Sequence, residues 1–357
     1  MGQKKLEGAT IEELFLEVSS ILKNDKRKKF RALCLNTDLS KYIIKNIFKK
    51  SFQVNDQGEF LELFTTYEKY EQEKEVYVYL FFTESLENII LFTLSSSDEL
   101  YKTMGSLIES TEGIYNLWIP PSFLEIIQEK ILDIRGSSLT YFSYENYASE
   151  RRGLKRKKGE GEYRGDDARS KLEKWKKEDE ITPTSFEFKI PPKTNIKINN
   201  TGEFILLNKK DIHVFPDNIN FFYENLIKMS INEVSEINRE IKTSTLDVIK
   251  TDTREKLEEK QLHIQLKDPL DYEDGSTFLE QMKSSSFMPY NYTTAEGSLI
   301  MEGNIVDKKN GGILSLSSNG ERFLLIPKYN TKFDSLLRFF RFLIERVDPN
   351  AEIVKRT

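Results

Sequence analysis

Glu187 and Lys189 are the two residues whose types and spacing come closest to hydrolytic chemistry in this sequence. They flank Phe188 in a segment that alternates apolar and polar residues, so a strand would place both side chains on one face of a sheet. A carboxylate and an ammonium group placed together in this way, with an upstream aspartate, can hold Mg²⁺ and activate a water molecule. The candidates for the third group are Asp166, Asp167 and Asp179.

The pattern around Glu187 and Lys189 also has a purely structural interpretation. Restriction-type nucleases use such a pair, but any half-buried strand with a glutamate and a lysine on its solvent face shows the same alternation. A motif this short matches many unrelated sequences. We therefore favour a strand with two solvent-facing charges, and keep a Mg²⁺-dependent nuclease built on Glu187 and Lys189 as the alternative.

Other catalytic motifs are missing from the sequence. The two histidines, His213 and His263, belong to no triad and to no HExxH motif. The chain has no P-loop, and the glycines between residues 159 and 165 miss the GxGxxG spacing by one position. The single cysteine, Cys34, excludes an internal disulfide and a cysteine-rich metal site, and its apolar neighbours predict a buried thiol. We predict a non-catalytic protein without a cofactor or a metal site.

Positive charge concentrates between residues 149 and 177. This segment holds 12 Lys/Arg and 6 Asp/Glu, a net charge of +6, whereas the rest of the chain, with 41 Lys/Arg and 52 Asp/Glu, carries −11. Such a separation favours binding to the phosphates of a nucleic acid, and aromatic side chains such as Tyr163 could stack on its bases. The candidate contact residues are Arg151, Arg152, Lys155, Arg156, Lys157, Lys158, Arg164, Lys171, Lys174, Trp175, Lys176 and Lys177.

The basic segment has two other interpretations. It could be a solvated linker whose lysines keep it soluble, with Trp175 buried against a domain. It could also dock onto an acidic protein surface, such as that of a second copy of the chain. We predict an intracellular binding protein that contacts nucleic acid, or a nucleic-acid-bound partner, through residues 151–177. A scaffold subunit that holds another protein through its aromatic-rich C-terminal part is a further alternative.

Composition is that of a globular protein. The chain has 357 residues, of which 38% are hydrophobic and 31% charged, and this length allows two or three domains. The N-terminus has no apolar signal core, and no apolar run approaches the length of a membrane span. We expect a cytoplasmic location and no membrane association.

The first 148 residues mix helical and strand patterns. Thr10 and Glu13 form a capping box that predicts a helix, and residues 30–36 read as a strand. Asp38 is the expected cap of a second helix that carries the apolar residues Leu39, Tyr42, Ile43 and Ile47. Two β-rich runs, residues 75–83 and 88–95, predict an antiparallel pair. Capped helices are also expected from residue 97 or 98 and from residue 122.

The composition changes after residue 149. Four glycines between residues 153 and 165 predict a flexible loop. Ala168, Leu172 and Trp175 then form one apolar stripe of a short helix, and residues 184–190 alternate as a strand with Phe186 facing the core.

Two later segments resemble each other, Asn200–Ile227 and Ser318–Ile344. Each predicts a turn at a glycine, Gly202 or Gly320, followed by a strand and then a helix. This similarity suggests a duplicated strand-turn-strand-helix unit, although chance alignment of apolar patterns is the alternative. The arginines expected on the outer side of the last helix, as a second basic patch, are Arg338, Arg341 and Arg346.

These elements predict an α+β fold with mixed or antiparallel sheets and helices packed on one face. The expected organisation is an N-terminal domain over residues 1–148, a basic connector over 149–180, a first strand-strand-helix unit over 181–245, a polar connector over 246–285 and a second unit over 286–357.

Overall fold

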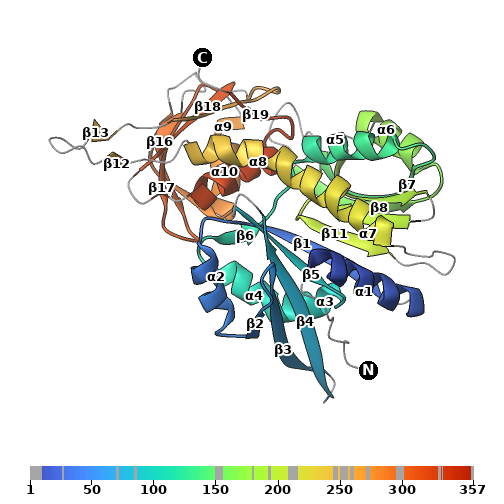
Figure 1. The fold of residues 1–357 in the computed structure, drawn as a ribbon. Coiled ribbons are helices and arrows are strands. Elements are labelled where there is room, and N and C mark those ends of the chain that lie inside the picture. Colours follow the sequence, from blue (N-terminus) through green and yellow to red (C-terminus); the bar gives the residue numbers. More distant parts are fainter. Residues whose placement is uncertain are drawn as a thin grey trace.

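The computed structural model describes residues 10–25, 28–69, 72–83, 87–148, 156–178, 181–191, 194–207, 216–243, 248–249, 256–257, 261–270, 274–294, 301–328, 331 and 333–354. These residues form an α+β protein built on two large antiparallel sheets (Figure 1), which confirms the predicted fold class. Among the described helices, none combines the length and the apolar character needed to cross a membrane.

The first sheet joins strands from both sides of residue 149. Its order is β2-β3-β4-β5-β1-β11-β10-β9-β7-β8, and β6 pairs with β1 off this path. The strands are β1 (Lys29–Thr37), β2 (Gln53–Asp56), β3 (Phe60–Lys69), β4 (Gln72–Phe82), β5 (Asn88–Thr93), β6 (Ile114–Asn116), β7 (Ser138–Ala148), β8 (Arg156–Arg164), β9 (Ile181–Ile190), β10 (Thr194–Asn199) and β11 (Glu203–Leu207). Because β1 pairs with β11 in register from Lys29 opposite Leu207, the hydrogen-bonded sheet runs through the predicted boundary at residue 149. The division into domains stays a prediction.

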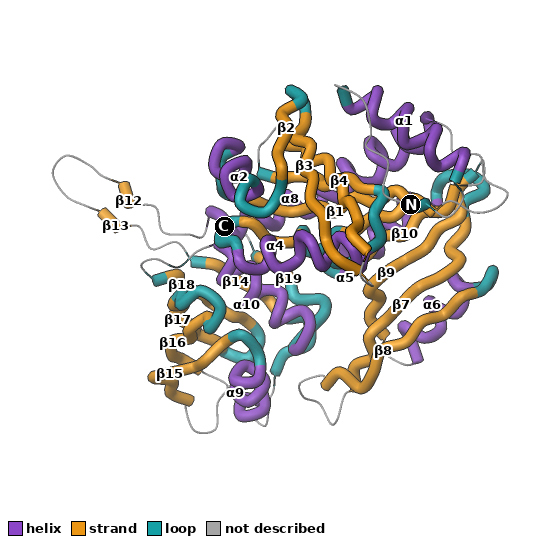
Figure 2. Tube along the Cα trace, turned by 90° about the horizontal axis from the view of Figure 1, so that it is seen from below, coloured by secondary structure: helices purple, strands orange, loops and turns teal. Residues whose placement is uncertain are grey.

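The second sheet has the order β15-β16-β17-β18-β14-β19. Its strands are β14 (Leu262–Gln265), β15 (Phe287–Thr294), β16 (Met301–Asp307), β17 (Ile313–Ser318), β18 (Arg322–Pro327) and β19 (Glu352–Ile353). Helices α9 (Asp274–Ser284) and α10 (Phe333–Arg346) share its core, where Phe278 and Phe339 are fully buried. The short strands β12 (Val248–Ile249) and β13 (Lys256–Leu257) pair with each other and lie apart from both large sheets (Figure 2).

Helices cover both faces of the first sheet, not one face as predicted. One core contains α1 (Ile11–Asn24), α5 (Pro121–Leu132), α6 (Ala168–Glu178) and the continuous helix α7-η2-α8 (Pro216–Phe221, Phe222–Ile227 and Lys228–Thr243). On the other face, α2 (Lys41–Phe48) and the helix α3-η1-α4 (Ser97–Leu100, Tyr101–Gly105 and Ser106–Ser110) cover β3, β4 and β5. Helix α8 contacts α5 and α10, so it connects the first sheet with the second (Figure 1).

Several local predictions are confirmed. Thr10 and Glu13 form the capping box of α1, and β4 and β5 pair antiparallel. Both strands bury apolar side chains on each face because helices pack on both sides, as the fully buried Leu91 and Phe92 show. Cys34 is also fully buried, as its apolar neighbours predicted.

Three predicted helix starts are wrong by one or two residues. Ser40, not Asp38, caps α2, and the helix buries Ile44, so Tyr42 is 75% exposed. Ser96 caps α3, one residue before the expected position. Helix α5 begins at Pro121, one residue before the expected Ser122, and no side chain caps it. Proline suits this first position because it lacks the N–H that would have no partner there.

The two similar segments have the same local architecture. Strands β10 and β11 form one hairpin and β17 and β18 form the other. Their turns contain Gly202 and Gly320 with φ of 75° and 87°, as predicted. Each hairpin shares a core with the helix that follows it, through Phe222 in the first copy and Phe339 in the second. The copies belong to different sheets, and the first helix contains the π-helical turn η2.

Candidate functional site

The described part of the basic segment is a strand and a helix. Residues 156–164 form β8, which pairs with β7 at the edge of the first sheet, so the predicted flexible loop is wrong for these residues. Gly161 lies within this strand, and the position requires a glycine because a Cβ there would press on the ring of Tyr144. Charged side chains on an edge strand also discourage pairing with another chain. The candidates Arg151, Arg152 and Lys155 lie outside the described residues.

Trp175 is half-buried and packs against aromatic rings of the first sheet. Its ring lies 5.7 Å from that of Phe142, 5.6 Å from that of Tyr144 and 5.4 Å from that of Tyr163. The hydroxyl of Tyr163 also donates a 2.6 Å hydrogen bond to Asp167. We therefore leave both aromatic rings out of the candidate contact surface.

The lysines of α6 form exposed, weak ion pairs. Lys174 lies 3.5 Å from Glu178, and Lys176 lies 2.6 Å from Glu125 on α5. Exposed pairs of this kind contribute about 0–1 kcal/mol, so these lysines can exchange a carboxylate for a phosphate at little cost. Lys177 is exposed beside them.

Arg164 lies on the opposite face of the sheet from α6. Its guanidinium is 4.7 Å from the centre of the Tyr141 ring and 3.1 Å from Glu187. Register explains this contact, because Arg164, Tyr141, Glu187 and Lys197 are paired in one row across β8, β7, β9 and β10. The structure thus separates Arg164 from the lysines of α6.

The Glu187–Lys189 pair does not form the predicted solvent-facing couple. Phe186 and Phe188 are buried as expected, and Lys189 is exposed, but Glu187 is only 2% exposed. Its carboxylate accepts hydrogen bonds from Arg164 and from Asn195 at 3.3 Å. Sequence alternation showed which face Glu187 occupies but not that neighbouring strands bury it.

Asp167 does not complete the predicted Mg²⁺ site of Glu187, Lys189 and one aspartate. It accepts a hydrogen bond from Tyr163, whose ring packs with Trp175 beside α6, on the other face of the sheet from Glu187. Asp166 is exposed in the turn before α6, and Asp179 lies outside the described residues. Within the part of the chain that the structure describes, no group of three or more His, Cys, Asp or Glu side chains is placed to hold a metal ion.

Lys197 continues this polar row towards the middle of the sheet. Its ammonium lies 4.9 Å from the centre of the Tyr141 ring. Burial lowers the pKa of Lys197 below its usual value, although the nearby carboxylates Glu203 and Glu187 act in the opposite direction. Glu203 in turn pairs with Arg31 at 2.8 Å, so charges line this face from β8 to β1.

A groove of about 530 Å³ lies beside this row. Its floor comes from β7, β8 and β9 and from the turn at Asn200, and its wall comes from α10. Trp118, which precedes α5, also lines it and packs edge-on against Phe340 of α10 at 6.3 Å. Because these segments are far apart in sequence, no local pattern could have indicated the groove.

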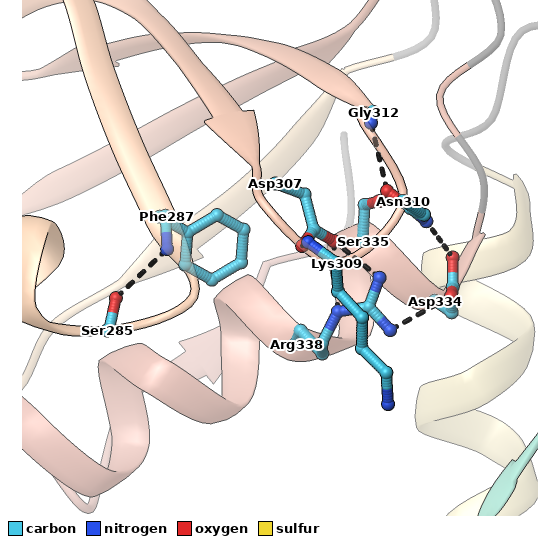
Figure 3. Close-up of polar contacts among 9 residues, drawn as sticks. All are labelled: Ser285, Phe287, Asp307, Lys309, Asn310, Gly312, Asp334, Ser335 and Arg338. Atoms are coloured by element: carbon cyan, nitrogen blue, oxygen red, sulfur yellow. Dashed lines mark hydrogen bonds and ion pairs between the residues drawn. The ribbon is translucent and has the colours of Figure 1, made fainter. Parts of the chain in front are cut away.

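A buried ion pair holds α10 in place as the groove wall. Asp307, at the end of β16, is 0% exposed and accepts hydrogen bonds from Arg338 and from the backbone N–H of Lys309 (Figure 3). Arg338 also pairs with Asp334 at 2.9 Å, and Asp334 accepts a bond from Asn310. These bonds join the β16–β17 turn to the first half of the helix.

The predicted basic patch on the last helix is therefore wrong for Arg338, which is half-buried and held in this network. Arg341 pairs with Glu345 at 2.6 Å and lies 5.8 Å from the centre of the Trp118 ring. Arg346 is exposed. Periodicity alone had placed all three on the outer side, but the β16–β17 turn and Trp118 pack against that side.

Comparison with known proteins adds no assignment: no family model matches the chain, and no curated protein matches it significantly.

Proposed function

We propose that this is a non-catalytic binding protein that contacts nucleic acid, or a nucleic-acid-bound partner, through β8 and α6. The observation that carries the proposal is the net charge of +6 in residues 149–177, beside −11 in the rest of the chain. A polyanion gains free energy on this segment by releasing counterions, whatever its base sequence.

The fold refines the proposed contact surface. Arg164 is excluded because its guanidinium already compensates the buried carboxylate of Glu187. The α6 lysines are retained because they are on the surface and their ion pairs are weak. The proposed contacts are Arg151, Arg152, Lys155, Arg156, Lys157 and Lys158 before and along β8, and Lys171, Lys174, Lys176 and Lys177 on α6.

The test is a gel-shift titration with single- and double-stranded DNA and RNA at several salt concentrations. Two charge-reversal variants test the two elements separately, and each replaces three basic residues by glutamate. The β8 variant changes Arg156, Lys157 and Lys158, and the α6 variant changes Lys171, Lys174 and Lys177. Each should weaken binding similarly for all base sequences and reduce the slope of log K against log salt by about 2–3, since each lost phosphate contact reduces it by about 1.

The matched control reverses three exposed lysines elsewhere, Lys23, Lys49 and Lys50. It makes the same change in net charge but lies outside the proposed contact surface, so it should leave the salt slope unchanged. Equal losses in the control and in both test variants, or no loss in any of them, would contradict the proposed surface, provided that circular dichroism shows intact folds.

A further inference from the structure

Two lysines lie without a hydrogen-bond or ion-pair partner on the face of the first sheet opposite α6. Neither Lys189 on β9 nor Lys197 on β10 forms such a contact with the residues that the structure describes. The ammonium of Lys197 lies 4.9 Å from the centre of the Tyr141 ring. A ring face attracts a cation but does not neutralise its charge.

Strand register places the two lysines side by side. Lys189 pairs with Asn195 and Lys197 pairs with Glu187, and residues opposite each other in a ladder face the same side of a sheet. The lysines are therefore diagonal neighbours, about 7–8 Å apart at the backbone and within reach of one another's side chains. Lys189 is exposed and Lys197 is half-buried, so a ligand from solvent can contact both ammonium groups.

The carboxylates near Lys197 each accept a hydrogen bond from another side chain. The donors and acceptors are Arg31 with Glu203, Arg164 with Glu187, and Tyr141 with Glu162. Burial outweighs the attraction of these carboxylates and lowers the pKa of Lys197. Because a charge that is shielded from water needs a partner of opposite sign, an anion at this position would stabilise the ammonium form.

Buried side chains form the floor under the two lysines. Tyr141 is 5% exposed, Asn195 is 4% exposed and Glu187 is 2% exposed, and Asn195 donates to Glu187 at 3.3 Å. These contacts fix the strands from which both lysines extend. The long lysine side chains can then adjust to a ligand while the floor stays in place.

We propose that Lys189 and Lys197 bind the phosphate group of a small phosphate monoester. Such a group carries a charge of about −1.5 to −2 at pH 7 and three acceptor oxygens, so it can pair with both ammonium groups at once. A sulfate ester or a phosphodiester carries one negative charge and compensates one lysine. This inference goes beyond the proposed nucleic-acid contact and uses different residues, so either can fail without the other.

Calorimetry with methyl phosphate tests the charge requirement. The ester is titrated to about 20 mM at an ionic strength of about 10 mM, since two charge-assisted contacts correspond to millimolar affinity and salt screens them. Methyl sulfate is the matched control because it has the same shape and a single negative charge. We expect saturable binding of methyl phosphate, and binding of methyl sulfate that is at least about fivefold weaker.

Variants locate the binding site. Lys197→Met keeps a long side chain without its charge and should weaken binding at least about tenfold, because one charge-assisted contact is lost. Lys189→Gln should weaken it about three- to tenfold, and this change at an exposed position leaves the core intact. The control, Lys49→Gln with Lys50→Gln, removes two exposed positive charges from the end of α2. It should change the dissociation constant less than about twofold.

Protection from acetylation gives a second, site-specific measurement. Acetic anhydride modifies accessible lysines, and mass spectrometry follows each of them separately. Saturating methyl phosphate should slow the acetylation of Lys189 and Lys197 at least about threefold, because the occupied ammonium groups are engaged with the ligand. The acetylation rate of Lys49 should stay the same.

Three results would overturn the proposal. The first is no saturable binding of methyl phosphate. The second is methyl sulfate binding as tightly as methyl phosphate, which would show that a single charge is recognised. The third is a loss of binding in the Lys49 and Lys50 control, or in the α6 charge-reversal variant, equal to the loss in Lys197→Met. That result would place the phosphate elsewhere on the protein.

Discussion

Arg164 on the edge strand β8 places its Nη1 atom 3.1 Å from Oε2 of Glu187 on β9, across the intervening strand β7. The arginine side chain is 60% exposed and the glutamate side chain only 3%. Removing the guanidinium would take one charged hydrogen-bond donor away from a buried carboxylate. This pair therefore helps to hold the edge strand on the sheet.

The first prediction follows from this asymmetry. Arg164→Ala should lower the free energy of unfolding by about 1–3 kcal/mol, because one charge-assisted hydrogen bond to a buried group is lost. Arg169→Ala is the control, since its partners among the described residues, Glu129 and Glu173, are exposed, and it should cost about 0.5 kcal/mol or less. Urea unfolding measures both. Equal effects would show that burial of Glu187 gives the Arg164 pair no added importance.

The second prediction concerns hydrolysis. Because the Glu187 carboxylate is bonded to Arg164 and Asn195, we expect the purified protein to leave labelled DNA and RNA intact in Mg²⁺ and in Mn²⁺. Gel electrophoresis of the products measures this. Cleavage that disappears in Glu187→Gln would instead support the nuclease alternative.

The third prediction is a pH dependence at the start of α3. Burial alone would raise the pKa of Glu99, but hydrogen bonds from Ser96 and Tyr67 outweigh it, so the pKa falls below 4.5. A carboxyl group with a lowered pKa stabilises the fold above its unfolded pKa, near 4.5, and this contribution is lost as pH falls through the folded pKa.

Glu99→Gln should therefore lower the free energy of unfolding by about 0.5–1 kcal/mol at pH 7, as the loss of a helix cap does. The difference in unfolding free energy between the variant and the wild type should shrink as the pH falls below 4.5 and through the lower, folded-state pKa of Glu99. Urea unfolding at several pH values checks this. A difference that stays constant into acid would mean that the charge of Glu99 contributes nothing.

The fourth prediction uses two glycines with positive φ. A Cβ at Gly202 would overlap the carbonyl oxygen of Leu117 and lie 2.8 Å from its Cβ, whereas a Cβ at Gly58 would meet nothing within 4 Å. Gly58→Ala should cost about 1–2 kcal/mol of backbone strain. Gly202→Ala should cost about 1–3 kcal/mol more, because the turn must also move. Equal melting temperatures for the two variants would show that the backbone at Leu117 moves away from the new Cβ at little energetic cost.

The fifth prediction concerns Cys34. Complete burial raises the pKa of its thiol, and only the thiolate reacts rapidly with disulfide reagents. Ellman's reagent should therefore label the native protein no faster than the protein unfolds, and should label it at once in guanidinium chloride. Rapid labelling of the native protein would mean that β1 opens locally.

The sequence by itself determined the features that depend on near neighbours. The capping box of Thr10 and Glu13, the buried face of Phe186 and Phe188 and the turn at Gly202 follow from helix and strand periodicity or from the allowed values of φ. These were predicted correctly because a few adjacent residues contain the whole pattern.

Only the tertiary structure decided what flanks each element. Residues 156–164 contain two glycines and form an edge strand because their backbone pairs with that of β7. Glu187 became buried because Arg164 and Asn195, on strands to either side, could satisfy its carboxylate. The groove formed where α10 meets the first sheet near Trp118. Each outcome depends on contacts between residues far apart in sequence, and no short window of the chain contains them.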